Sequence, residues 1–84
     1  SEEKTANIVL NGLDKLEAAF SGDQYDSAYA GDILDEVTTQ LSKMAEKGDI
    51  DPKTWTELIY PRLQRYHEAR QIAAGYDPNG QPEE

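Results

Sequence analysis

Apolar residues recur every three or four positions in three segments of this chain, and short stretches containing Gly and Asp separate the segments. This spacing places the apolar residues on one face of an α-helix, so it predicts three amphipathic helices. Short connections between such helices favour antiparallel neighbours, and 84 residues suffice for one domain. The sequence therefore predicts an all-α fold, an antiparallel three-helix bundle over residues 1–75, followed by a flexible acidic C-terminal tail at residues 76–84.

The first helix is predicted from about Glu2 to Phe20, with Ser1 as its N-cap. Its apolar face consists of Ala6, Val9, Leu10, Leu13, Leu16 and Phe20. Asn11-Gly12 interrupts this face, and Asn-Gly is also typical of a β-hairpin turn. We prefer the helix because the 3.6-residue period continues across Gly12, where the missing side chain indicates a close approach to another backbone.

The second helix is predicted from a cap at Asp23 to about Lys47, with Gly48 as its C-terminal stop. Its apolar face consists of Tyr29, Ala30, Ile33, Leu34, Val37, Leu41, Met44 and Ala45. Gly31 lies inside this segment, so a short helix followed by a new start at Asp32 is the alternative.

The third helix is predicted to begin at the cap Asp51, with Pro52 at its first position, and to end at Gly75. Its apolar face consists of Trp55, Leu58, Ile59, Leu63, Tyr66 and Ala73. Pro61 removes a backbone hydrogen bond and collides with the carbonyl of residue 57 in a regular helix. The helix is therefore expected to kink or split at Pro61, and a split there or at Gly31 would give a four-helix variant.

Arg62 is an anomaly in the third helix. At 100° per residue it falls within about 40° of Trp55 and Tyr66, in the middle of the apolar face. A charge in this position needs a partner or water. It can pair with Glu36, turn outward at the kink, or stack its guanidinium on an aromatic ring. The functional alternative is that this side of the helix is partly uncovered and binds a partner.

Most enzyme and metal chemistries lack the residues they need. The chain has no Cys and one His, His67, and Gln71 stands where the zinc motif His-Glu-x-x-His needs its second His. A calcium loop beginning at Asp26 lacks side-chain oxygens at its third, fifth and twelfth positions. We therefore expect a protein that is not an enzyme and that binds no metal and no cofactor.

The net charge of −9 is concentrated in residues 1–42, which hold nine acidic residues and two lysines. This charge disfavours direct binding to nucleic acids or to anionic membranes. It leaves open a nucleic-acid-mimicking inhibitor that uses the acidic face of the first two helices. The residues of that face are Asp23, Asp26, Asp32, Asp35 and Glu36.

The third helix concentrates the residue types that dominate protein interfaces, since it holds the one Trp and all the arginines. The predicted contact residues are Trp55, Tyr60, Arg62, Arg65, Tyr66 and Arg70. We therefore expect a small acidic protein-binding module, acting as adaptor, regulatory subunit or inhibitor. Another protein is its expected partner, and homo-oligomerisation is compatible with this hypothesis. The absence of Cys, and of an apolar run long enough to span a membrane, favours a cytoplasmic location without membrane binding.

Overall fold

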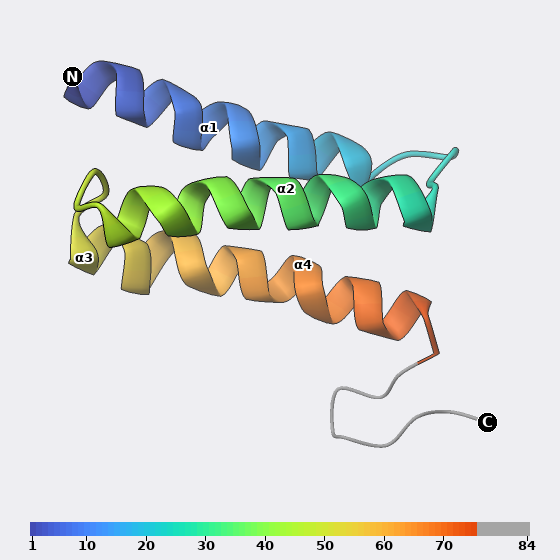
Figure 1. Cartoon of the computed structure of the whole chain (residues 1–84). Coiled ribbons are helices and arrows are strands. Elements are labelled where there is room, and N and C mark those ends of the chain that lie inside the picture. Colours follow the sequence, from blue (N-terminus) through green and yellow to red (C-terminus); the bar gives the residue numbers. More distant parts are fainter. Residues whose placement is uncertain (76–84) are drawn as a thin grey trace.

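The structure is a computed structural model that describes residues 1–75, and these residues form three helices (Figure 1). The first is α1 (Glu2–Ala19) and the second is α2 (Ser27–Glu46). The third is one joined, kinked helix made of α3 (Pro52–Thr54), the π-helical turn η1 (Trp55–Ile59) and α4 (Tyr60–Ala73). The predicted all-α three-helix bundle is confirmed, and the third helix is kinked rather than split. The predicted tail at residues 76–84 lies outside the described residues.

The bundle is flat, with extents of 47 × 28 × 16 Å, and α2 lies between the other helices (Figure 1). Both α1 and α4 pack on α2, whereas the backbones of α1 and α4 stay apart and meet through side chains. One apolar core joins the three helices. Its buried members are Leu13, Leu16, Leu34, Val37, Leu41, Met44, Ile50, Ile59 and Leu63.

The start of α1 follows the sequence prediction. The Ser1 hydroxyl accepts a hydrogen bond of 3.2 Å from the backbone N–H of Lys4, which would otherwise lack a partner at the helix end. Gly12 is buried inside the helix, so Asn11-Gly12 is not a hairpin. A Cβ atom at Gly12 would lie 3.2 Å from Cγ1 of Val37, so the glycine permits the close approach of α1 to α2.

The second helix begins later than the sequence indicated, because its N-cap is Asp26 and not Asp23. The Asp26 carboxylate accepts hydrogen bonds from the N–H groups of Ala28 and Tyr29, at 3.0 and 3.1 Å. Residues 21–26 form the irregular connection, in which Gly22 has a φ of 98°. The helix then continues through Gly31, so the alternative start at Asp32 is not adopted.

The third helix begins as predicted, since the Asp51 carboxylate caps the N–H groups of Lys53 and Thr54, both at 3.1 Å. Ahead of Pro61 the helix widens into η1, where the N–H of Tyr60 donates to the carbonyl of Trp55 five residues earlier. A wider turn accommodates the proline ring, which in a regular α-helix collides with the carbonyl of Glu57. The kink therefore has an identifiable cause in the π turn and the proline.

The extra residue in η1 also changes which side chains face the core. It rotates the following helix by about the 100° that one residue spans. The predicted apolar face is wrong in part. Leu58 is 68% exposed and Ala73 is exposed, whereas Ile59 and Leu63 are buried. Trp55 is half-buried at the edge of the core.

Candidate protein-binding site

The six contact residues predicted on the third helix do not form one patch. Trp55 and Tyr60 pack against each other, with ring centroids 5.9 Å apart. Trp55 also borders a hollow formed with Ser42 and Ala45 of α2. These two aromatic residues therefore lie where the third helix meets the end of α2.

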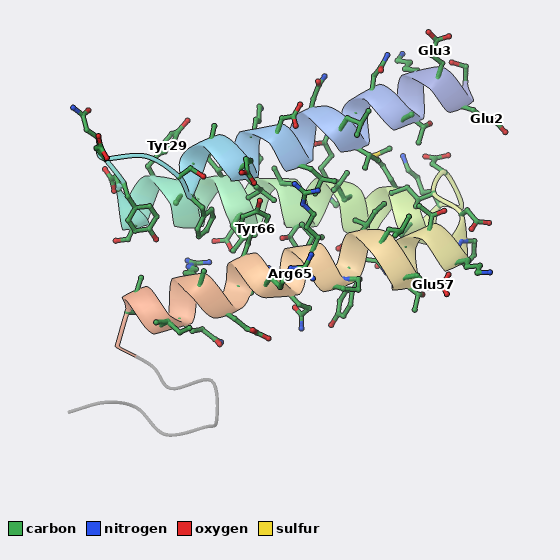
Figure 2. All side chains as sticks on the ribbon, turned by 180° about the vertical axis from the view of Figure 1, so that it is seen from behind. Glu2, Glu3, Tyr29, Glu57, Arg65 and Tyr66 are labelled. Atoms are coloured by element: carbon green, nitrogen blue, oxygen red, sulfur yellow. The ribbon has the colours of Figure 1, made fainter. Side chains whose placement is uncertain are left out.

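Tyr66 instead faces α1 (Figure 2), and the ion pair of Arg62 is also with α1. The Tyr66 hydroxyl donates a hydrogen bond of 3.1 Å to Oε2 of Glu17, and Nη2 of Arg62 lies 3.9 Å from the same oxygen. The ring of Phe20 lies 5.0 Å from the ring of Tyr66. Of the alternatives considered for Arg62, pairing with Glu36 is not adopted, because the ion pair of Arg62 is with Glu17 of α1 and not with a residue of α2.

An open hollow of about 470 Å³ lies beside these contacts, where the end of α1 meets α4. We call it the Arg–Tyr hollow, and its lining consists of Phe20, Ser21, Arg62, Arg65, Tyr66 and Ala69. Arg65 is exposed, and within residues 1–75 its guanidinium forms no ion pair. The hollow thus combines two aromatic rings with one arginine whose hydrogen-bond donors face solvent.

Three residues at this site were not among the predicted contact residues. Glu17, Phe20 and Ser21 all come from the last turn of α1 and the residues after it. The available signal was an aromatic residue, Phe20, at the end of the first helix. Placing it beside Tyr66 required a regular helical period through the third helix, and η1 interrupts that period.

Arg70 is engaged at the surface of the bundle, between α4 and α2. Its Nη1 donates a hydrogen bond of 2.8 Å to Oδ1 of Asp35, and its guanidinium covers Gly31. A Cβ atom at residue 31 would lie 3.0 Å from Nε of Arg70. One residue of the predicted third-helix surface therefore pairs with one residue of the predicted acidic face, and both have a structural role.

The predicted acidic face is exposed but not uniformly negative. All five of its carboxylates are exposed, yet Asp26 caps α2 and Asp35 binds Arg70. Lys15 and Lys43 border the same hollow as Asp35 and Glu36. Positive charges are thus interspersed among the carboxylates along this side of the bundle.

The other features of residues 1–75 give little support for a further functional site. His67 forms a hydrogen bond of 3.1 Å with the Thr38 hydroxyl, which joins α4 to α2. Across residues 1–75, no three His, Asp or Glu side chains are grouped so that they could hold a metal ion. None of the helices in this part of the chain has the length and apolar composition needed to cross a membrane.

Comparisons with known proteins give no information about the function of this site. No protein-family model, no curated protein and no solved structure matches the chain.

Proposed function

We propose that this chain is a small, acidic, non-enzymatic protein-binding module that acts as an adaptor, regulatory subunit or inhibitor. The observation that carries the proposal is the Arg–Tyr hollow. It gathers Arg62, Arg65, Tyr66 and Phe20 at one open surface. Tyrosine and arginine are the residue types that most often anchor protein interfaces, in part because they combine apolar area with hydrogen-bonding groups.

The three arginines of the third helix differ in what holds them. Arg70 binds Asp35 at 2.8 Å, and Arg62 lies near Glu17 at 3.9 Å. Arg65 has no such partner in the described part of the chain, so its planar guanidinium can receive a carboxylate from another protein. The proposed partner therefore presents an Asp or Glu beside an apolar group that packs against the rings of Phe20 and Tyr66 where they line the hollow.

Affinity capture from the native lysate tests the proposal. The full chain is compared with Arg65→Glu and with the control Lys53→Glu, which makes the same charge change at an exposed position away from the hollow. We expect a partner that Lys53→Glu retains and that Arg65→Glu loses, with about tenfold weaker binding in titration of the purified pair. Equal retention by both variants would refute the role of the hollow, provided that circular dichroism shows both variants folded.

A nucleic-acid-mimicking inhibitor is the second candidate. Its support is that Asp23, Asp32 and Glu36 are exposed and form no ion pairs within residues 1–75. It is weakened by Lys15 and Lys43, which interrupt the negative surface. The same capture separates the candidates. A partner lost on combined Asp23→Asn, Asp32→Asn and Glu36→Gln, yet retained by Arg65→Glu, would favour the mimic.

A further inference from the structure

A second concave surface lies at the other end of the space between α1 and the third helix. It is an open groove of about 460 Å³ between the first half of α1 and residues 49–59. Figure 2 shows this end of the bundle at Glu2 and Glu57, away from Tyr29. We call it the N-terminal groove. Its apolar lining consists of Ala6, Val9, Leu10, Ile50 and Ile59.

The groove exists because α2 does not cover the whole apolar face of α1. Leu13 and Leu16 are buried in the core, but one turn earlier Leu10 is 57% exposed. Ile50 and Ile59 form the inner wall and are each only 4% exposed. A leucine held in water beside a buried apolar wall retains area that a partner can still bury, at about 25 cal/mol per Å².

Carboxylates surround this apolar lining. Glu2, Asp49 and Asp51 all border the groove. Glu2 begins α1, and Asp51 caps α3. The ion pair closest to the rim is weak, because Nζ of Lys47 lies 4.0 Å from Oδ2 of Asp49 and the two side chains are 70% and 48% exposed. The rim is therefore negative, on a chain whose net charge is −9.

An apolar floor with an acidic rim is complementary to a helix with one apolar face and basic flanks. Such a helix places apolar residues at positions i, i+3 or i+4 and i+7 into a groove, and its Lys or Arg residues reach the rim. A second copy of this chain is a poorer match, because two rims of the same charge would face each other.

We propose that the N-terminal groove binds a basic amphipathic helix of a protein partner. This inference rests on the proposed function, since it concerns a partner protein, and it adds a surface separate from the Arg–Tyr hollow. Leu10 is the central apolar contact. Glu2 and Asp49 attract the basic flanks and are not needed for the fold of the core.

The test is an NMR titration of the isotope-labelled full chain with a designed 18-residue peptide. The peptide carries Leu on one helical face and Lys elsewhere, and its control carries Glu in place of every Lys. We expect saturable amide shifts at residues 2–10 and 49–59, at least tenfold weaker binding of the Glu peptide, and weakening by added salt. Shifts confined to the exposed carboxylates of α2, or equal binding of the two peptides, would overturn the inference.

Matched variants locate the binding. Leu10→Lys removes the central contact, and Ile72→Lys makes the same change outside the groove at nearly the same exposure, 57% against 59%. We expect Leu10→Lys to weaken binding of the Lys peptide at least tenfold and Ile72→Lys to change that binding less than about twofold. Equal effects would overturn the inference, as would a peptide-free dimer that Leu10→Lys dissociates.

The rim is tested in the same way. Combined Glu2→Gln and Asp49→Asn should weaken binding of the Lys peptide about threefold to tenfold. Combined Asp32→Asn and Glu36→Gln should leave that binding unchanged. Arg65→Glu separates this inference from the proposed function. Loss of a captured partner on Arg65→Glu, together with no groove-specific peptide binding, would refute the groove and leave the Arg–Tyr hollow supported.

Discussion

Two glycines inside helices give a quantitative test of the packing, because the same substitution meets different neighbours. Replacing a helix-interior Gly by Ala favours the helix by about 1 kcal/mol. At Gly31 the new Cβ would lie 3.0 Å from Nε and 3.2 Å from Cζ of Arg70. The guanidinium is the mobile end of a half-exposed side chain, so it can move at the cost of its bond to Asp35. That exposed bond contributes at most about 1 kcal/mol.

Gly31→Ala is therefore expected to change the free energy of unfolding by about 0 to +1 kcal/mol, a neutral or stabilising effect. At Gly12 the new Cβ would lie 3.2 Å from Cγ1 of Val37, which is buried and β-branched and has little rotamer freedom. Overpacking of this kind costs about 1–3 kcal/mol. Gly12→Ala should accordingly change stability by about 0 to −2 kcal/mol.

Urea unfolding, followed by Trp55 fluorescence and by circular dichroism, measures both variants. The Arg70→Ala background supplies the control. There the Gly31→Ala substitution should give the full stabilisation of about 1 kcal/mol, since no guanidinium has to move. The reasoning is refuted if Gly12→Ala is the more stable of the two single variants. It is also refuted if Arg70→Ala leaves the effect of Gly31→Ala unchanged within measurement error.

Two further predictions concern helix boundaries and helix phase. Asp26→Ala should lower the free energy of unfolding by about 1 kcal/mol, because it removes the cap of α2, whereas Asp23→Ala should change it by less than about 0.5 kcal/mol. Urea unfolding compares the two variants, and equal losses would contradict the role of Asp26 as the cap. Ile59→Ala should lower the free energy of unfolding by about 2–4 kcal/mol and Leu58→Ala by less than about 0.5 kcal/mol, because η1 buries Ile59 and leaves Leu58 exposed. A larger loss for Leu58→Ala than for Ile59→Ala in the same assay would show that the π turn is absent.

Local signals in the sequence were sufficient for much of the fold. Ser1 and Asp51 cap their helices through backbone groups only two or three residues away, so their roles follow from neighbouring sequence. Asp23 was predicted as the cap of the second helix, whereas Asp26 caps α2, because the connection needs three more residues to reach the start of that helix. That length is set by packing, which a local pattern does not contain.

The candidate site was less predictable because one backbone feature governs it. Pro61 indicated a disturbed helix, but not that the disturbance would be a π turn that inserts one residue. The regular helical projection put Arg62 on the face of Trp55, whereas the structure pairs it with Glu17. The residue types of the surface were thus accessible from the sequence, while their grouping and their partners on α1 were not.

The central position of α2 has a consequence for motion. Each outer helix packs on α2, but α1 and α4 are joined mainly by the side chains of Glu17, Phe20, Arg62 and Tyr66. Separating α1 from α4 would break those contacts and open the apolar core that the three helices share, while each outer helix would keep its packing on α2. Such an opening would widen the hollow and the groove together, because both lie between α1 and the third helix.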